Sequence, residues 1–337
     1  MSAGPITRIA LDGVGGDHGL DVTVPAALEA LRLQPGLTIV LVGPKALVQG
    51  LNSRHERLEV ASCASVLDSG VNPRAALRAG TQSNVGQALQ LQAQGVVHAS
   101  VSAASTTALL TLGVKSLGLL PGVLRPALGT TMPTRHGETL LLDLGANLEA
   151  NASHLVQFAL MGHSVRCAKG MRAPRVGLLN VGHEDGKGHA SVREAHRQLV
   201  SLGLNYQGFI EGDDLFAGAV DVAVCDGFSG NLVLKSSEGL ARMLFTSLSE
   251  TIRTSWRSRL GAWLARPALR SLLARFDPSA HNGAPLLGLN GVVVKSHGSS
   301  GRAATVQALL EAAREAAGEV PARIRQEIEQ HNQENTT

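Results

Sequence analysis

The chain has 337 residues, of which 44% are hydrophobic and 3% aromatic, and its formal net charge is +3. That length can bury a large core, either as one sizeable α/β domain or as two closely fused ones. Proteins that bind nucleic acids usually carry a strongly basic surface or aromatic residues that stack on bases. The composition therefore argues against nucleic acid as a partner.

Cysteine content and the first residues indicate the compartment. The cysteines Cys63, Cys167 and Cys225 are odd in number and without a C-x-x-C pair, so neither a disulfide framework nor a zinc site is indicated. The N-terminus lacks the basic and then apolar segments of a signal peptide. The longest stretch without Lys, Arg, Asp or Glu, residues 79–114, is interrupted by glutamines and a Ser/Thr cluster, which is untypical of a membrane span. We expect a soluble, cytoplasmic protein.

Short apolar runs that end in small or polar residues recur along the chain. Strands are expected at residues 9–11, 37–42, 99–101, 139–144, 176–181, 208–210, 222–225 and 292–294. Helical segments are expected between them at residues 24–31, 87–94, 155–161 and 192–202. This alternation predicts an α/β fold with a doubly wound, mainly parallel sheet. The loops after the strands should then share one edge of the sheet, where such folds bind ligands.

The loop after the first strand, residues 12–19, resembles a dinucleotide-binding fingerprint. It fails the test, because the G-x-G-x-x-G spacing counted from Gly13 places His18 where the third glycine belongs. What remains is a flexible loop that carries two carboxylates, Asp12 and Asp17, at the end of a strand.

Residues 182–188 form the strongest candidate for an anion-binding loop, because Lys187 lies between two glycines that leave backbone N–H groups accessible. The loop is not a Walker A motif, since Gly188 stands where the magnesium-binding Ser or Thr belongs. An isolated lysine in such a loop is more often simply solvated. No G-x-S-x-G elbow, H-E-x-x-H helix or other metal-ligand spacing occurs. An enzyme with this sequence should use neither an acyl-serine nor a bound metal.

The segment 221–239 changes abruptly from an apolar run into a polar turn. Asp226, Ser229 and Asn231 place a carboxylate, a hydroxyl and an amide in a glycine-rich turn, after which the chain has the character of a helix. Backbone N–H groups at such strand ends and helix N-termini point at bound anions. Asp226 therefore either serves a binding site or merely caps the helix.

A series of motifs follows one another along the chain: LDGVGGD, RPAL, LDLGAN, LVQFALMG, PRVGLLNVG, EDGKG, EGDD, VCDGFSGN, LKSSEG and NGAPLLGLNGVVVKSHG. In this order they resemble the bacterial phosphate acyltransferase family, the acyl-ACP:phosphate enzymes called PlsX. The resemblance covers residues 9–324, and the block at residues 282–298 is long enough to be specific.

The resemblance implies an activity and partners. Family members move a fatty acyl group from the thioester of acyl carrier protein (ACP) to inorganic phosphate, which gives an acyl phosphate for phospholipid synthesis. The resemblance also implies a fold similar to that of isocitrate and isopropylmalate dehydrogenases and of phosphotransacetylase. It further implies a homodimer that associates peripherally with an anionic membrane surface, and chemistry that needs no cofactor.

Catalytic roles are implied for three residues that match family motifs. Lys187, in the K-G loop, would bind phosphate or the developing thioester oxyanion. Asp226, in the D-G-F-x-G-N block, would orient Lys187 or accept a proton from the attacking phosphate. His297, in the K-S-H-G block, either protonates the departing thiolate or is a structural histidine.

Further matching residues are expected to bind substrate or to fix the loops around it. They are Asp12, Gly15, Gly16, Asp17, Ser102, Thr106, Asn147, Asn180, Gly227, Gly230, Asn231, Asn282, Lys295 and Ser296.

The chain departs from the family pattern at three places. Where the family has S-A-G-N-T-G-A-L, residues 102–109 read SAASTTAL, so Ala104 and Thr107 add Cβ atoms where substrate approaches the backbone. A lysine-rich segment of the family appears here as AGTQSN at residues 79–84, and His183 replaces a glutamate.

Two alternatives to an acyl-ACP:phosphate enzyme remain open. One is a phosphotransacetylase-like exchange of acyl groups between coenzyme A and phosphate. The other is a catalytically decayed scaffold at the membrane, against which the retention of Lys187, Asp226, Asn231 and His297 argues.

Residues 251–276 contain six arginines and no acidic residue. Trp256, Leu260, Trp263 and Leu264 fall on one helical face, and after a break at Pro267 a second apolar stripe follows at Leu269, Leu272, Leu273 and Phe276. This pattern is typical of a helix that lies on an anionic membrane. Packing on the core or across a dimer, and docking of the acidic ACP, are the alternatives.

We expect one α/β catalytic domain over residues 1–337. The amphipathic helical arm should be inserted at about residues 245–280, and a polar tail should begin at about residue 328.

Overall fold

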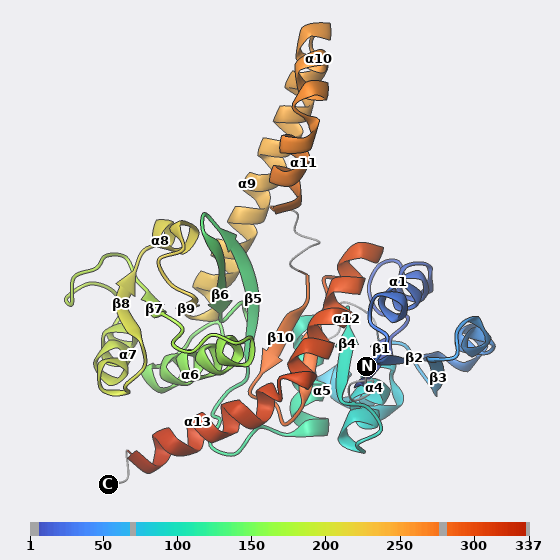
Figure 1. The fold of residues 1–337 in the computed structure, drawn as a ribbon. Coiled ribbons are helices and arrows are strands. Elements are labelled where there is room, and N and C mark those ends of the chain that lie inside the picture. The colour runs from blue at the N-terminus through green and yellow to red at the C-terminus, as the bar shows by residue number, and fades with distance from the viewer. Residues whose placement is uncertain (1–6, 68–71, 276–281, 335–337) are drawn as a thin grey trace.

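One sheet runs through the part of the chain that the computed structural model describes, residues 7–67, 72–275 and 282–334 (Figure 1). Its strands lie in the order β3 (Leu58–Cys63), β2 (Leu37–Pro44), β1 (Thr7–Asp12), β4 (Ala99–Ser102), β11 (Val292–Lys295), β10 (Ala284–Leu287), β5 (Ala127–Thr134), β6 (Gly137–Leu142), β9 (Val222–Val224), β7 (Val176–Leu179) and β8 (Tyr206–Ile210). All the strands expected from the sequence are present. Strands β3, β5 and β10 were not expected.

The sheet is mainly parallel, as predicted, but its two halves run in opposite directions. Strand β10 pairs antiparallel with both β11 and β5, and β5 pairs antiparallel with β6. All other pairings are parallel. The expectation that every loop shares one edge is therefore wrong, because an odd number of antiparallel pairings reverses the chain direction between β11 and β6. The polar loops form two groups, one in each half.

Helices cover both faces of the sheet (Figure 1). They are α1 (Leu20–Leu33), α2 (Lys45–Val48), α3 (Pro73–Ala79), α4 (Asn84–Ala93), α5 (Thr106–Leu117), α6 (Ala152–Ala168), α7 (Ala190–Ser201), α8 (Gly212–Ala217), α9 (Gly227–Arg253), α10 (Trp256–Leu264), α11 (Arg266–Arg275), α12 (Arg302–Ala317) and α13 (Val320–Glu334). In the first half, α1 and α12 pack on one face of β1 and α4 packs on the other. In the second half, α6, α7 and α13 share a core with β6, β7 and β9.

An arm made of α9, α10 and α11 projects from the body (Figure 1). The expected break before Pro267 is present: α10 ends at Leu264, and Pro267 lies in the first turn of α11, where its missing N–H costs nothing. A second break, at Thr254 and Ser255, was not expected. The predicted stripe of Trp256, Leu260, Trp263 and Leu264 lies in α10, where all four side chains are exposed. The side chains of Leu272 and Leu273, and Phe276 as a whole, lie outside the described residues.

The C-terminal region differs from the expected polar tail. Helix α13 continues to Glu334, and Ile328 is fully buried in the core that α13 shares with α6. The polar composition of residues 328–334 belongs to the exposed face of a packed helix, and a single apolar residue per turn is enough to anchor it.

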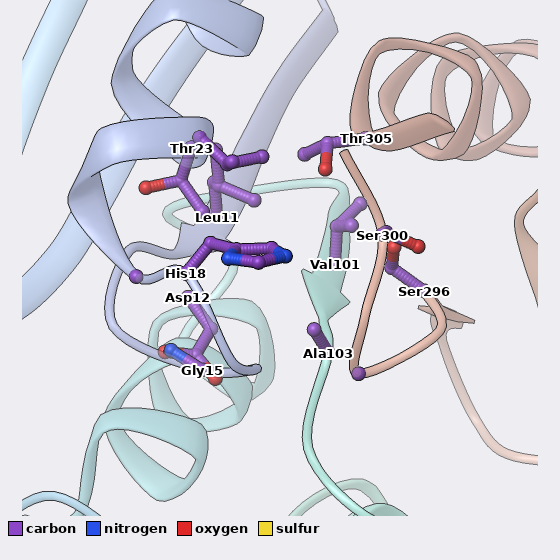
Figure 2. Close-up of a pocket in the computed structure, with 13 residues that line it drawn as sticks. Leu11, Asp12, Gly15, His18, Thr23, Val101, Ala103, Ser296, Ser300 and Thr305 are labelled. Atoms are coloured by element: carbon purple, nitrogen blue, oxygen red, sulfur yellow. The ribbon is translucent and has the colours of Figure 1, made fainter. Parts of the chain in front are cut away.

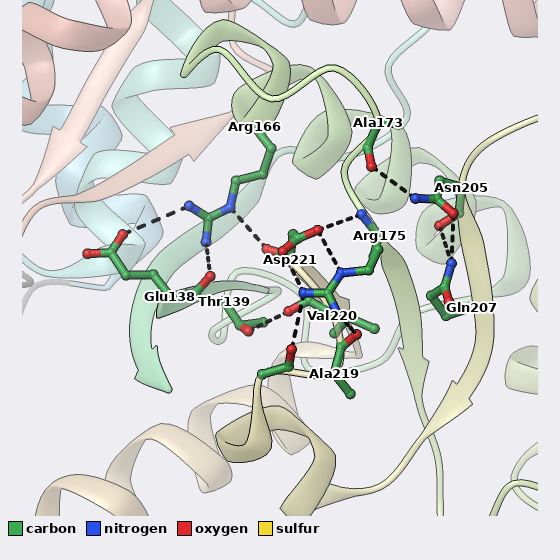
Figure 3. A network of polar contacts seen from close by, with 11 residues as sticks. Glu138, Thr139, Arg166, Ala173, Arg175, Asn205, Gln207, Ala219, Val220 and Asp221 are labelled. Atoms are coloured by element: carbon green, nitrogen blue, oxygen red, sulfur yellow. Dashed lines mark hydrogen bonds and ion pairs between the residues drawn. The ribbon is translucent and has the colours of Figure 1, made fainter. Parts of the chain in front are cut away.

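Charged side chains tie the second half together at the starts of its strands (Figure 3). The Arg175 side chain donates to both carboxylate oxygens of Asp221 and to the carbonyls of Gly218 and Ala219. The buried Arg166 donates to the carbonyls of Asp221 and Glu138. These bonds satisfy backbone carbonyls at the edge of the sheet that lies away from the candidate site.

Among the described residues, no helix has both the length and the apolar character that are needed to cross a membrane.

Helix α12 buries a carboxyl group without a hydrogen-bond partner. Glu315 is 3% exposed and its Oε1 atom has no partner among the described residues. Burial, with the nearby charge of Glu311, raises the pKa of Glu315 to about 8. The group is therefore protonated in the folded protein at neutral pH.

We predict that Glu315 makes the free energy of unfolding fall as pH rises. The folded pKa of about 8 exceeds the ordinary value of 4.5, so the folded state holds a proton that the unfolded state loses. The stability that this proton contributes is lost as pH rises from 4.5 to about 8. In Glu315→Gln, unfolding in urea at about pH 5 and about pH 9 should give a smaller difference than in the wild type, by at least ~1 kcal/mol. Equal pH dependence of the two proteins would contradict the assignment.

Candidate functional site

In the first half of the sheet, the loop after β1 is organised by a buried carboxylate. Asp12 accepts hydrogen bonds from the Ser102 hydroxyl and the Asn84 amide, both at 2.7 Å, and from the Gly15 N–H at 3.0 Å. Burial raises the pKa of Asp12, and these hydrogen bonds oppose the rise. Asp12 therefore joins the β1 loop, α4 and the β4 loop, which is a loop-fixing role.

The same loop meets the loop between β11 and α12. The Asp17 N–H donates to the Gly298 carbonyl at 2.8 Å. Gly16 has a φ of +79°, and a Cβ atom there would lie 2.7 Å from that carbonyl oxygen, so both the conformation and the contact require glycine. A narrow pocket lies beside this contact, and the His18 ring points into it toward Val101 of β4 (Figure 2). Ser300 also lines the pocket.

Hydrogen bonds from Asn282 hold the K-S-H-G block in place. The Asn282 amide donates to the Ser296 hydroxyl and to the Ala304 carbonyl, both at 2.8 Å, and its oxygen accepts from the His297 N–H at 3.2 Å. The Ser296 N–H donates to the Ser102 carbonyl at 2.9 Å. Asn282 and Ser296 thus fix the loop, while the His297 side chain stays exposed next to the Ser299 hydroxyl.

Lys295 is half-buried, and the pKa of its amino group is unusually low for a lysine. Its Nζ atom donates to the Ser296 carbonyl at 3.1 Å. Burial, and after it the charge of Lys235, lowers the pKa of Lys295 to about 8. Partial burial and the same two lysine charges lower the pKa of His297. The charges of Lys235 and Lys295 therefore act on this region, while the carboxylates of Glu238 and Asp17 act on His297 in the opposite sense.

In the second half, the loop after β6 depends on Asp143, which the sequence analysis did not single out. Its buried carboxylate accepts from the N–H groups of Leu128, Leu144, Ala146 and Asn147 and from the Asn147 side chain. Burial raises the pKa of Asp143, and these hydrogen bonds oppose the rise. The signal for Asp143 was its place at the end of an expected strand, in the LDLGAN motif. Asn147, which was expected to contact substrate or to fix a loop, contacts Asp143 and the Pro126 carbonyl.

The D-G-F-x-G-N turn packs closely against the loop that follows β6. The Gly227 N–H donates to the Asn147 carbonyl at 2.7 Å. A Cβ atom at Gly230 would lie 2.0 Å from the Asp143 carbonyl oxygen, so only glycine allows the approach. Asp226 accepts from the Ser229 N–H at 2.7 Å, which makes it the N-cap of α9. The capping alternative for Asp226 is therefore confirmed as its structural role.

Helix α9 links the two groups of loops. Asn231 lies over Gly145 in its first turns, and Lys235 follows one turn later on the same face. Lys235 pairs with Glu238 at 2.9 Å, and its charge acts on Lys295 and His297 in the other half. Lys235 was not expected from the sequence to belong to the site, although it stands in the LKSSEG motif. The charge of Lys235, just after the D-G-F-x-G-N block, thus acts on the K-S-H-G block.

Lys187 occupies an exposed loop that Asn180 closes. The Asn180 amide donates to the carbonyls of Gly182 at 3.1 Å and Lys187 at 3.3 Å. His183, at the position of the family's glutamate, has its Nε2 atom 3.4 Å from an Asp214 carboxylate oxygen. In the described parts of the chain, no hydrogen bond or ion pair joins Lys187 to Asp226 or His297.

The altered block at residues 102–109 is accommodated locally. Ala104 is buried and its N–H donates to the Ser102 hydroxyl at 3.0 Å. Thr106 begins α5, and Thr107 is exposed in the first turn of that helix. The added methyl at Ala104 therefore packs inward, while Thr107 adds bulk at an open helix end.

Comparisons with known proteins show which family this chain resembles. A model of the family described as fatty acid synthesis protein matches residues 7–323. A protein named phosphate acyltransferase from Alkalilimnicola ehrlichii is 45% identical over 95% of this chain and 96% of its own length. One of the same name from Methylococcus capsulatus is 43% identical over 95% and 96%.

Solved structures show the same fold at low identity. A phosphotransacetylase from Streptococcus pyogenes is 19% identical, with a TM-score of 0.61 over 92% of this chain and 94% of that one. A branched-chain phosphotransacylase from Enterococcus faecalis V583 is 17% identical, with a TM-score of 0.61 over 92% and 99%. The fold is thus one that phosphotransacetylases share. The long matches at over 40% identity show that this chain belongs to the fatty acid synthesis protein family, together with the bacterial phosphate acyltransferases.

Proposed function

We propose that this protein transfers a fatty acyl group from the thioester of ACP to inorganic phosphate, and so forms an acyl phosphate for phospholipid synthesis. Family membership supports the acyltransferase activity. The proposal takes ACP as donor and includes a homodimer that associates peripherally with the membrane, as the resemblance implies. A phosphotransacetylase-like use of acyl-CoA is the second candidate, favoured by the shared fold.

The observation that carries the proposal is the position of α9: Asn231 packs against Gly145, and the charge of Lys235, one turn later, acts on Lys295 and His297. The charges of Lys235 and Lys295 repel each other, and an anion bound beside them relieves that repulsion. A phosphate dianion offers that charge, and Asn231 with the N–H groups of the adjoining turns offers hydrogen bonds to its oxygens.

The chemistry is a transfer of an acyl group between sulfur and oxygen. A phosphate oxygen attacks the thioester carbonyl carbon, and the tetrahedral intermediate collapses when the carbon–sulfur bond breaks. The proton lost by phosphate ends on the departing thiolate. Neutral His297 is suited to accept and then donate that proton, because its lowered pKa keeps it uncharged near neutral pH. We propose that Lys187 contacts the developing oxyanion or the phosphate.

The proposal is tested first with the two acyl donors. Purified protein mixed with labelled phosphate should form acyl phosphate from acyl-ACP much faster than from acyl-CoA. Lys187→Ala should lower kcat on ACP, because a charge-assisted contact to a buried anion contributes on the order of 1.5–3 kcal/mol, and should leave the Tm nearly unchanged. Lys45→Ala, which removes an exposed lysine of the other half, is the matched control.

The outcomes of that assay separate the candidates. Faster turnover of acyl-CoA would favour the phosphotransacetylase-like function. Absence of turnover with both donors in a folded wild type would favour a decayed scaffold. Unchanged kcat and phosphate KM in Lys187→Ala would contradict the role proposed for that lysine.

A second prediction concerns pH. Only the protonated form of Lys295 attracts phosphate, and its pKa of about 8 places the loss of that charge within the working range of an enzyme. We expect kcat/KM for phosphate to fall as pH rises above 8 in the wild type. In Lys295→Arg the fall should move to much higher pH, because arginine stays charged. Identical profiles for the two proteins would show that Lys295 does not hold the anion.

We also propose that the arm contacts an anionic membrane. Trp256 is 70% exposed, Trp263 65% and Leu264 68%, so these large apolar side chains are mostly open to solvent. The Arg257 guanidinium lies over the Trp256 ring, 5.6 Å from its centroid. Arginines lie beside them on the same helices, as on helices that lie in the headgroup region of anionic lipid. The same arginines could instead bind the acidic ACP. The test therefore also measures turnover of acyl-ACP.

For this arm we predict loss of lipid binding in the double variant Trp263→Glu, Leu264→Glu. The wild type should co-sediment with anionic vesicles more than with neutral ones, and the variant should not, because two carboxylates are costly to bury in lipid. The control is Phe216→Glu, which changes an exposed apolar residue of α8. Equal sedimentation of wild type and double variant would rule out the membrane role, and loss of acyl-ACP turnover without lipid would assign the arm to ACP docking.

A further inference from the structure

A histidine, a cysteine and a glutamate meet between α6 and α13, in the second half of the fold. His163 and Cys167 lie one turn apart on α6, and Glu327 reaches them from α13. One ligand atom from each residue lies within 4.8 Å of the other two. Neither the proposed reaction nor the loops around Lys295 use these residues.

Within this cluster, one carboxylate oxygen of Glu327 has no hydrogen-bond partner among the described residues. Glu327 Oε1 lies 2.9 Å from His163 Nδ1, whereas Glu327 Oε2 is enclosed and has no partner among the described residues. An enclosed carboxylate oxygen without a donor is costly. Arg323, whose charge acts on Cys167, donates its Nε proton to the Gly318 carbonyl at 2.9 Å.

The distances fit a small tetrahedral metal ion. Bonds of about 2.0–2.3 Å to nitrogen, oxygen and sulfur place neighbouring ligand atoms ~3.3–3.8 Å apart. Cys167 Sγ lies 3.6 Å from His163 Nε2 and 3.9 Å from Nδ1. The imidazole gives one nitrogen to an ion. With Nδ1 as that ligand, Cys167 Sγ would move closer by a few tenths of an ångström, and Glu327 Oε1 would retreat by about half an ångström from its present 2.9 Å.

We propose that His163, Cys167 and Glu327 bind a zinc ion that joins α6 to α13. A thiolate, an imidazole and a carboxylate together favour Zn²⁺ over Mg²⁺ or Ca²⁺, which prefer oxygen ligands. The side chains are partly exposed, so water completes the coordination. Binding releases the thiol proton of Cys167 to solvent.

The site is structural. His163 lies twelve residues beyond the cap of α6 at Asn151, which is roughly 18 Å along the helix from the loop that Asp143 organises. The ion would fix α13 on the core that Val320, Ile324 and Ile328 form with α6. Turnover should therefore not depend on it. The sequence did not indicate this site, because its ligand from α13 is far from the other two along the chain.

The test uses the full chain stripped of metal and titrated with Co²⁺. We expect thiolate-to-metal absorption that saturates at one equivalent in the wild type and disappears in Cys167→Ser, which keeps the size of the side chain. Zn²⁺ at a large excess over its Kd should raise the wild-type Tm by at least ~3 °C and should leave the Tm of Cys167→Ser unchanged. Cys63→Ala, at a buried cysteine in the first half, is the control that should behave like the wild type.

The variant Glu327→Gln distinguishes a metal site that includes Glu327 from metal bound by Cys167 alone. It should weaken Co²⁺ binding at least tenfold, because a carboxylate ligand is replaced by a neutral amide. The proposal is overturned if the wild type gives no thiolate-to-metal absorption. It is also overturned if Cys167→Ser keeps the metal-dependent rise in Tm.

Discussion

The buried carboxylate of Asp143 is the interaction on which the second half of the candidate site depends. It gathers four backbone N–H groups and the Asn147 side chain, and so folds the loop after β6 into one shape. The turn that begins α9 packs directly on this loop, with Gly230 against the Asp143 carbonyl. A buried charge with this many donors is costly to disrupt, because removal of the acceptor leaves several N–H groups unsatisfied. The position of α9 therefore follows from Asp143.

Helix α9 connects the polar loops of the two halves of the sheet, which point in opposite directions. The antiparallel strands β10 and β5 send the polar loops of the two halves in opposite directions. A site that uses both halves needs an element that runs from one to the other. Helix α9 does so within its first turns, since Asn231 lies at the second group of loops and Lys235 acts on Lys295 and His297 in the first. The same helix then continues into the arm, so one element joins the anion-binding region to the surface proposed to meet lipid.

The sequence was most informative where a single physical cause decided the local structure. The apolar run at residues 222–225 predicted β9, which is buried, because alternation is unnecessary for a strand covered on both faces. Strand β10 was missed because it has four residues and contains Pro285, which is untypical of a central strand. Because β10 and β5 were not expected, the reversal of strand direction between the two halves of the sheet was not predicted either.

Among the site residues, those that fix loops could be identified by their motifs, but their partners could not. Asp12 bonds to Asn84 and Ser102, which are far from it along the chain, and no spacing encodes such contacts. Lys235 has the sequence context of an ordinary surface lysine on a helix. Its significance depends on the distance of α9 from Lys295, which is a property of the tertiary fold.

The central claim is that an anion binds between α9 and the loop after β11. Its most direct test is a crystal soaked with tungstate, an oxyanion that resembles phosphate and scatters anomalously. The account predicts a strong anomalous peak between the side chains of Lys235 and Lys295, within hydrogen-bond reach of Asn231 or His297. A peak confined to the loop at residues 182–188, or none near Lys295, would contradict it.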